Sequence, residues 1–192
     1  SVGAWKTGML ADAPVVRTVA EALPEGAALV IDPVMVSTSG HRLLAEDAIA
    51  DLAELLIPRA AVVTPNLPEA EVLARMRVTT LEDMEEAGRR VLDLGARAVV
   101  VKGGHLAGDA TVDLFVDRDG VTGGSGPRYP HSVHGSGCCF SAALTAHLAR
   151  GMDARHAFEA AREFIDTAIR EATGGPGPIR IVNPGGTILR GD

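Results

Sequence analysis

The sequence has few cysteines, few aromatic residues and no long apolar run, and each shortage excludes a class of protein. Two cysteines in 192 residues cannot form a disulfide-rich scaffold, and they indicate a reducing, cytoplasmic compartment. No apolar run approaches the roughly 20 residues of a membrane-spanning helix, and the first residues show no signal-peptide pattern. Aromatic residues make up 3% of the chain and hydrophobic residues 46%, so we expect a globular core of Ala, Val and Leu.

Clusters of Lys and Arg are absent too, and the formal net charge is -7. This charge argues against nucleic acid as a partner, and the acidic excess is typical of a solvated surface. The length predicts one domain over residues 1–192, long enough to bury a sizeable core. We find no internal repeat, linker or low-complexity segment.

What the sequence does contain is an alternation of strand-like and helix-like segments. Short apolar, β-branched runs predict buried strands over residues 27–32, 60–64 and 97–102. Caps and apolar periodicity predict helices over 14–23, 46–56, 80–94, 138–150 and 153–172. The stretch "VDLFVDRDGV" predicts a hairpin around an Asp-Gly turn. The alternation indicates an α/β fold: an open, mostly parallel sheet with helices on both faces.

Polar or glycine residues follow each of the three expected strands. Asp32 follows the first, Asn66 and Glu69 follow the second, and Lys102 and Gly103 follow the third. Each alone is more simply a turn residue. Because ligands of open α/β sheets bind beyond the carboxyl ends of the strands, their combination at one rim favours a binding site.

A glycine loop, "HGSGCC", directly precedes the helix expected from residue 138. It lacks the spacing and the Lys of a phosphate-binding Walker A loop, and it does not match the dinucleotide fingerprint. Gly135, Ser136 and Gly137 nevertheless allow backbone amides to turn inward at a helix N-terminus and form an anion hole. Cys138 falls in the first helical turn, where the pKa of a thiol is typically lowered.

Four interpretations of this loop compete. Both cysteines can be small core residues, which we favour for Cys139. A zinc site of His131, His134, Cys138 and Cys139 lacks a familiar ligand spacing. Cys–His acyl-transfer chemistry explains the thiol and the anion hole but leaves the rim residues without a role. Phosphoryl transfer needs an anion hole, carboxylates that organise a metal, a nucleotide site and a group that activates the acceptor, so it uses all of them.

Five short motifs, in order, resemble the hydroxymethylpyrimidine/phosphomethylpyrimidine kinases of thiamine biosynthesis. They are "KTGML" (6–10), "IDPVM" (31–35), "TPNLPEAE" (64–71), "VKGGH" (101–105) and "HGSGCCFSAAL" (134–144). The resemblance covers residues 1 to about 178. It implies the three-layer ribokinase-like fold and an ATP-dependent kinase that requires Mg²⁺.

The resemblance implies a role for each residue of the glycine loop. Cys138 would activate the hydroxymethyl oxygen of the substrate and contact that substrate. Gly135, Ser136 and Gly137 would form the anion hole for the transferring phosphoryl group. Met9 would pack against the pyrimidine ring.

The same resemblance assigns the rim residues to ATP and its metal. Asn66 and Glu69 match an N-x-x-E motif that organises Mg²⁺ largely through water, and Asp32 would lie by the metal and the phosphates. Asp32 and Glu69 are thus the expected metal residues. Lys102 and Gly103 would line the nucleotide side.

The chain also departs from the family pattern. Ser136 and Cys139 stand where relatives often carry Thr, and we expect Cys139 to serve packing. Members of the family that the chain resembles begin with a further glycine-rich βα unit. The sequence from Ser1 onward contains no counterpart of that unit. We therefore expect an unpaired sheet edge, a pocket that lacks one wall, and an edge through which a homodimer could form.

The main functional hypothesis is phosphorylation of 4-amino-5-hydroxymethyl-2-methylpyrimidine and of its monophosphate. One alternative is a pyridoxal or pyridoxine kinase of the same fold, which also phosphorylates a hydroxymethyl group on a heteroaromatic ring. Another is a non-catalytic domain that senses a pyrimidine or a nucleotide.

Overall fold

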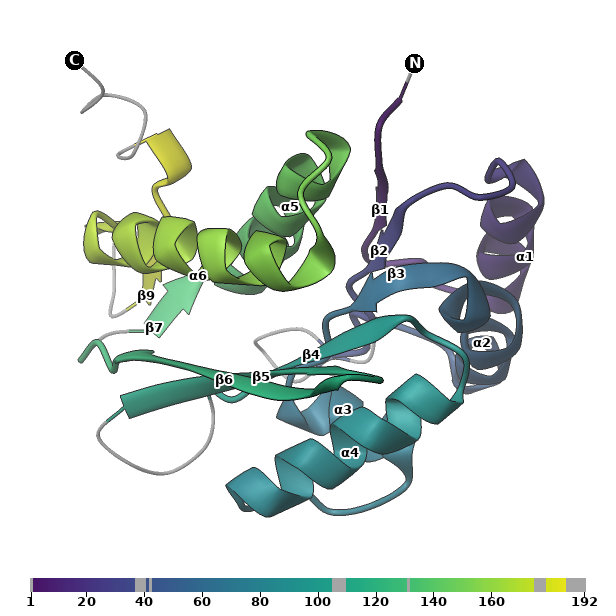
Figure 1. The fold of residues 1–192 in the computed structure, drawn as a ribbon, viewed down its shortest axis with the longest axis horizontal. Coiled ribbons are helices and arrows are strands. Elements are labelled where there is room, and N and C mark those ends of the chain that lie inside the picture. Colours follow the sequence, from purple (N-terminus) through teal and green to yellow (C-terminus); the bar gives the residue numbers. More distant parts are fainter. Residues whose placement is uncertain are drawn as a thin grey trace.

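The computed structural model describes residues 2–36, 41, 43–104, 110–130, 132–174 and 179–185. The strands are β1 (Trp5–Thr7), β2 (Leu29–Ile31), β3 (Ala60–Val63), β4 (Ala98–Lys102), β5 (Ala110–Asp117), β6 (Gly120–Pro127), β7 (Ser132–His134), β8 (Thr173–Gly174) and β9 (Ile179–Ile181). The α-helices are α1 (Ala13–Ala22), α2 (Glu46–Asp51), α3 (Leu67–Ala74), α4 (Leu81–Asp93), α5 (Ser136–Ala149) and α6 (Ala154–Arg170). Figure 1 shows their arrangement.

The central sheet has six strands in the order β1-β2-β3-β4-β5-β6. The pairs from β1 to β4 are parallel, and β5 and β6 continue the sheet as an antiparallel hairpin. A smaller sheet, β7-β9-β8, lies beside α6 (Figure 1). The predicted α/β class with a mostly parallel sheet is confirmed.

Alternate residues of β2, β4 and β5 enter two separate cores. Val99 and Val101 of β4 pack with α1 to α4, whereas Val100 packs with α5 and α6. This division follows from the pleat of a strand, which sends successive side chains to opposite faces. Helices therefore cover both faces, and in Figure 1 α5 and α6 lie above the sheet while α3 and α4 lie below it.

Three phenylalanines dominate the core under α5 and α6. Phe158 is 1% exposed, and its ring centroid lies 5.6 Å from that of Phe115 and 6.4 Å from that of Phe140. Burial of each such ring contributes roughly 1.5–3 kcal/mol. Half of the six aromatic residues of the chain thus pack together beneath one helix pair.

The helix-capping signals act where the sequence places them. The Asp12 carboxylate accepts a hydrogen bond from the Val15 amide at 3.0 Å and begins α1. Thr80 and Asp83 form a reciprocal capping box at the start of α4, and Gly95 follows its end with a φ of 110°. The predicted helices over 14–23 and 80–94 are confirmed.

The helix expected over 46–56 is present, but it is α-helical only to Asp51 and continues as a π-helical turn, Leu52–Leu56, and a 3-10 turn, Ile57–Arg59. Pro58 has no amide hydrogen and restricts the residue before it, so a regular helix cannot run through this point. The segment after Asn66, interpreted from the sequence as a turn, is helix α3.

Strand β1 lies at one edge of the central sheet. Within the described part of the chain, β1 pairs with β2 alone.

None of the helices in the described part of the chain combines the length and apolar character required to cross a bilayer.

Candidate functional site

The site is built around Asp32, which directly follows β2 and is 2% exposed. Its Oδ1 accepts a hydrogen bond from Lys102 Nζ at 2.9 Å, and its Oδ2 accepts one from Ser141 Oγ at 3.1 Å. Thr64, at the end of β3, donates to Oδ1 at 3.4 Å. The carboxyl ends of β2, β3 and β4 thus meet at one buried ion pair. A buried charge needs such partners, because removing one of them leaves the other uncompensated.

The glycine loop lies over this ion pair. Gly135 has a φ of 88°, which favours glycine, and its carbonyl accepts a hydrogen bond from the Cys139 amide at 2.9 Å. Lys102 Nζ lies so close to Gly137 that a Cβ at residue 137 would be 3.2 Å from it. The loop and the rim, far apart in sequence, are therefore neighbours, as predicted.

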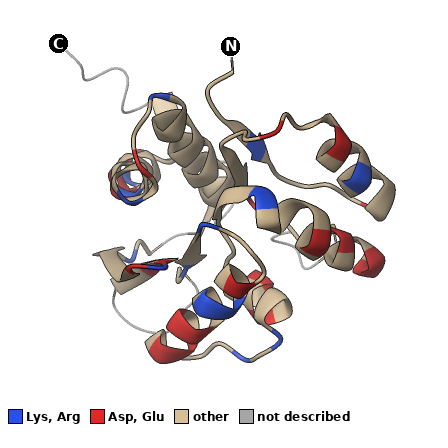
Figure 2. Ribbon diagram, turned by 45° about the vertical axis from the view of Figure 1, so that its right-hand side comes forward, with Lys and Arg blue, Asp and Glu red and all other residues tan. Residues whose placement is uncertain are grey.

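Helix α5 begins at Ser136, two residues before its predicted start, because the turn at Gly135 leads directly into helix. No side chain caps this N-terminus. Figure 2 shows that α5 carries no Lys, Arg, Asp or Glu, in contrast to α4. The amides of its first turn and the Lys102 ammonium together make this corner attractive to an anion.

The two cysteines lie in different environments. Cys138 is exposed, whereas Cys139 is half-buried and belongs to neither core cluster. Burial, and to a lesser extent the neighbouring Cys138, raise the pKa of the Cys139 thiol. Cys138, which the sequence analysis selects as the candidate catalytic cysteine, is therefore the more accessible of the two thiols.

Ser141 is a site residue that sequence reasoning missed. Its hydroxyl lies 3.1 Å from Asp32 Oδ2 and 3.1 Å from the Cys138 carbonyl oxygen, one turn earlier in α5. It is completely buried and so joins the turn that carries Cys138 to the ion pair. The only signal in the sequence is its place three residues after Cys138, in the predicted helix 138–150.

The N-x-x-E motif has a structural role. Asn66 Oδ1 accepts the Glu69 amide at 2.9 Å, and Glu69 Oε2 accepts the Asn66 amide at 2.8 Å, which forms a capping box for α3. Glu69 is 4% exposed, and this burial raises the pKa of its carboxyl. Lys102 opposes that rise and Asp32 adds to it, so Glu69 is coupled electrostatically to the ion pair.

Gly103 directly follows Lys102, the last residue of β4. Its amide donates to Asp113 Oδ1 at 2.9 Å. A Cβ at this position would lie 1.9 Å from the Val112 carbonyl oxygen, so the chain requires glycine here.

Met9 lies near the end of β1 and is 59% exposed. The Thr7 carbonyl of β1 accepts the Asp32 amide at 3.1 Å, which places this strand end at the same rim.

The zinc interpretation receives no support from the described residues. Among them, no three His, Cys, Asp or Glu side chains are grouped so that they could hold a metal ion. His131, one of its four ligands, lies outside the described residues.

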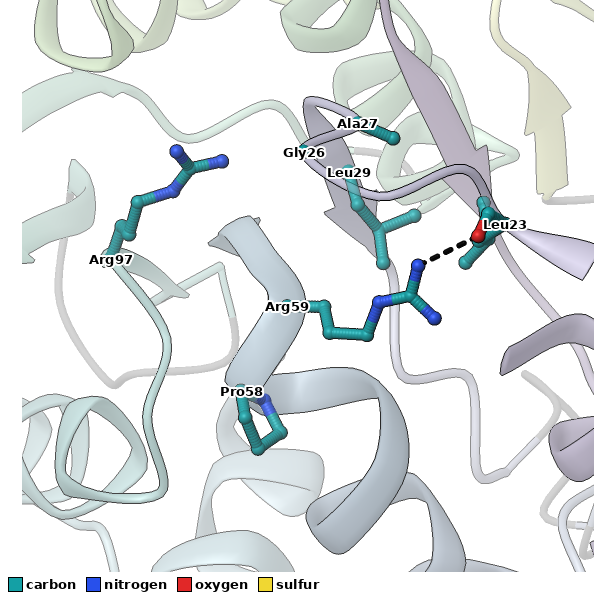
Figure 3. Close-up of a pocket in the computed structure, with 7 residues that line it drawn as sticks. All are labelled: Leu23, Gly26, Ala27, Leu29, Pro58, Arg59 and Arg97. Atoms are coloured by element: carbon teal, nitrogen blue, oxygen red, sulfur yellow. Dashed lines mark hydrogen bonds between the residues drawn. The ribbon is translucent and has the colours of Figure 1, made fainter. Parts of the chain in front are cut away.

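A hollow lies at the opposite, amino end of the strands (Figure 3). It measures about 260 Å³ and is lined by Leu23, Gly26, Ala27, Leu29, Pro58, Arg59 and Arg97. The Arg59 guanidinium donates to the carbonyls of Ala20, Leu23 and Pro24, which terminate α1. This arginine is a helix cap, and the hollow shares no residue with the rim.

Comparison with known proteins gives consistent results. A family model described as phosphomethylpyrimidine kinase matches residues 1–179. The hydroxymethylpyrimidine/phosphomethylpyrimidine kinase of Bacillus subtilis is 39% identical over 182 residues, which cover 91% of this chain and 67% of that protein.

Two solved structures share the fold. The Bacillus subtilis pyridoxal kinase in complex with ADP matches with a TM-score of 0.90 and 36% identity, over 99% of this chain and 73% of that one. The Staphylococcus aureus pyridoxal kinase in complex with AMP-PCP and pyridoxal matches with a TM-score of 0.87 and 32% identity, over 95% and 67% of the two chains. The chain thus spans about two thirds to three quarters of the length of these proteins.

Proposed function

The chain belongs to the phosphomethylpyrimidine kinase family, and we propose that it transfers the terminal phosphoryl group of ATP to 4-amino-5-hydroxymethyl-2-methylpyrimidine. We propose its monophosphate as a second acceptor, both steps serving thiamine biosynthesis. The expected phosphotransferase class and ribokinase-like fold are confirmed.

One observation carries the proposal: the uncapped N-terminus of α5 meets Lys102 beside an exposed thiol. A transferring phosphoryl group carries its charge on the equatorial oxygens. The amides of residues 135–138 and the Lys102 ammonium are donors for those oxygens. Preorganised donors of this kind stabilise the transition state without reorganisation.

Cys138 is our proposed catalytic base. The acceptor oxygen attacks the terminal phosphorus of ATP, the bond to the bridging oxygen of ADP breaks, and the hydroxyl proton passes to the Cys138 thiolate, which becomes the neutral thiol. In a loose transition state the proton leaves late, so a moderately basic thiolate is sufficient. The exposure of Cys138 leaves it accessible to the acceptor.

The carboxylates fit a magnesium ion held through water. Asp32 and Glu69 are coupled but both are engaged by hydrogen bonds, and the described residues offer no third carboxylate. Mg²⁺ retains several waters and commonly uses one or two carboxylates together with phosphate oxygens. Bound there, the ion would neutralise charge on the ATP phosphates, while Lys102 and Gly103 line the nucleotide side.

The acceptor is the main open choice. The two solved pyridoxal kinases favour pyridoxal as the second candidate substrate. A sensor would bind a pyrimidine or a nucleotide without turnover. We propose a cytoplasmic enzyme because both cysteines are free thiols.

A homodimer formed through the β1 edge stays a prediction, which analytical ultracentrifugation of the purified chain would test.

An ADP-release assay on the purified chain separates these functions. It would use ATP and Mg²⁺ with the pyrimidine alcohol, its monophosphate or pyridoxal in turn. We expect release with the pyrimidine alcohol and a kcat/KM at least tenfold lower with pyridoxal. Release with pyridoxal alone would select the alternative kinase, and binding without release would select the sensor.

A further inference from the structure

We propose that Asp113 and Arg162 are positioning residues that fix the Gly103 backbone at the nucleotide side of the site. The inference rests on the proposed function, because that function assigns Lys102 and Gly103 to the nucleotide. It adds two residues, from β5 and α6, to which the sequence analysis gives no functional role.

Asp113 joins two parts of the molecule through its two oxygens. Oδ1 accepts the Gly103 amide at 2.9 Å, and Oδ2 accepts Arg162 Nε at 2.9 Å. The side chains of Arg162 and Asp113 are only 16% and 18% exposed. The pair is therefore shielded from water, where a charge-assisted hydrogen bond is strongest.

Strand β6 leaves room for the guanidinium. A Cβ on Gly124 would lie 2.2 Å from Arg162 Nη1, and one on Gly126 would lie 3.2 Å from Nη2. Nη1 also donates to the Ser125 carbonyl at 3.3 Å. Arg162 thus occupies space beside Gly124 and Gly126 that a side chain at either position would crowd.

The position of Gly103 matters for the site because it follows Lys102. The Val112 carbonyl blocks any side chain at residue 103, so neighbouring groups fix the backbone there. A shift of this backbone would move Lys102, whose Nζ contacts Asp32 and lies beside Gly137. Asp113 therefore controls the lysine that we assign to the phosphates.

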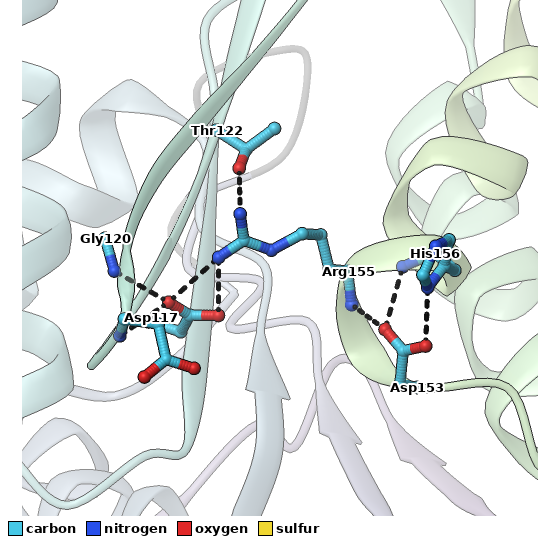
Figure 4. Close-up of polar contacts among 7 residues, drawn as sticks. Asp117, Gly120, Thr122, Asp153, Arg155 and His156 are labelled. Atoms are coloured by element: carbon cyan, nitrogen blue, oxygen red, sulfur yellow. Dashed lines mark hydrogen bonds and ion pairs between the residues drawn. The ribbon is translucent and has the colours of Figure 1, made fainter.

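A second ion pair between the same two elements provides a matched control (Figure 4). Arg155 Nη2 contacts Asp117 Oδ2 at 3.1 Å, and Asp117 Oδ1 accepts the amides of Asp119 and Gly120 at the hairpin turn. Arg155 lies two helical turns before Arg162, and Asp117 lies on the same side of β5 as Asp113. Both pairs fasten α6 to β5, but only Asp113 holds Gly103.

The test compares Arg162→Met with Arg155→Met, using direct binding of ADP and ATP with Mg²⁺ measured by calorimetry. We expect both variants to lower the Tm, but only Arg162→Met to weaken nucleotide binding, by roughly tenfold, as for the loss of one charge-assisted hydrogen bond. Arg162→Lys should restore part of that affinity. In turnover, Arg162→Met should raise the KM for ATP and leave the KM for the alcohol unchanged.

Equal effects of Arg155→Met and Arg162→Met on nucleotide affinity, or no effect of either, would overturn the proposal. Asp113→Asn, which keeps an oxygen for the Gly103 amide, should bind nucleotide more tightly than Asp113→Ala; the reverse order would also overturn it. Nucleotide binding needs no turnover, so an error in the acceptor leaves this test intact. A wild-type chain that binds no nucleotide would refute both proposals.

Discussion

The two ends of the parallel strands carry different polar groups. At the carboxyl ends of β2 and β4, Asp32 and Lys102 form an ion pair beneath the N-terminus of α5, which has no side-chain cap. At the amino ends, Arg59 donates to three carbonyls at the C-terminal end of α1. The amino end has a hollow of about 260 Å³, yet the Arg59 guanidinium there is engaged by three backbone carbonyls. The carboxyl end has helix amides without a side-chain cap and an exposed thiol. The carboxyl end therefore offers donors to a ligand, whereas the arginine at the hollow caps α1.

The strongest challenge to this contrast is Cys138→Ala. We expect kcat to fall roughly 10²–10⁴-fold, because a general base is removed, while the affinity for ATP stays nearly constant. Steady-state kinetics with ATP and the pyrimidine alcohol would measure both. Cys139→Ala is the matched control and should retain most of the activity. Wild-type turnover in Cys138→Ala would refute the assignment of the base.

Breaking the ion pair at the carboxyl end should affect both stability and binding. Lys102→Met leaves the buried Asp32 carboxylate without its cation, which typically costs about 3–5 kcal/mol. Urea unfolding should show this loss, and calorimetry should show weaker ATP binding. Unchanged ATP affinity in the folded variant would remove Lys102 from the nucleotide site.

The corresponding change at the amino end should affect stability alone. Arg59→Met removes the hydrogen bonds to the carbonyls of Ala20, Leu23 and Pro24, and we expect a loss of about 1–3 kcal/mol in unfolding free energy. The kcat and KM of the folded protein should match wild type. A selective rise in either KM would show that the two ends are not functionally distinct.

The smallest expected effect is a pH dependence. Burial raises the pKa of Glu69 in the folded state above 4.5, so the folded protein binds this proton more tightly than the unfolded chain does. This contribution is fully present below about pH 4.5 and is lost as the pH rises through the raised pKa. Relative to Glu69→Gln, which keeps a capping side chain, wild type should therefore lose unfolding free energy from pH 4 to pH 7.

Asp83 supplies a control of opposite sign. Hydrogen bonds from Thr79 and Thr80 lower the pKa of Asp83, so its contribution is present above its ordinary pKa and is lost on acidification. The difference between wild type and Asp83→Asn should shrink as the pH falls below 4. If both variants showed the same pH trend, the buried site and the exposed cap could not be distinguished electrostatically.

The sequence predicts the parallel strands and most helices because their caps and apolar patterns are local. Asp32 and Lys102 could be placed at one rim because strand ends in such sheets converge. Ser141 could not be identified, since its importance depends on a contact with Asp32, 109 positions away in sequence. Helix α3 was missed because Asn followed by Leu-Pro predicts a turn and a helix start equally well. Asp113 lies in the predicted hairpin and Arg162 in a predicted helix, but neither local pattern indicates their contact, which depends on the packing of α6 on β5.

The valines of β4 limit how the length of the chain can change. Adding one residue between Val99 and Val101 would exchange the side chains beneath the two helical layers along the rest of that strand and rotate Lys102 away from Asp32. The same addition at the turn between β5 and β6, where the chain is exposed, would alter neither layer. Insertions tolerated in homologous chains should therefore concentrate at that turn and avoid the central strands.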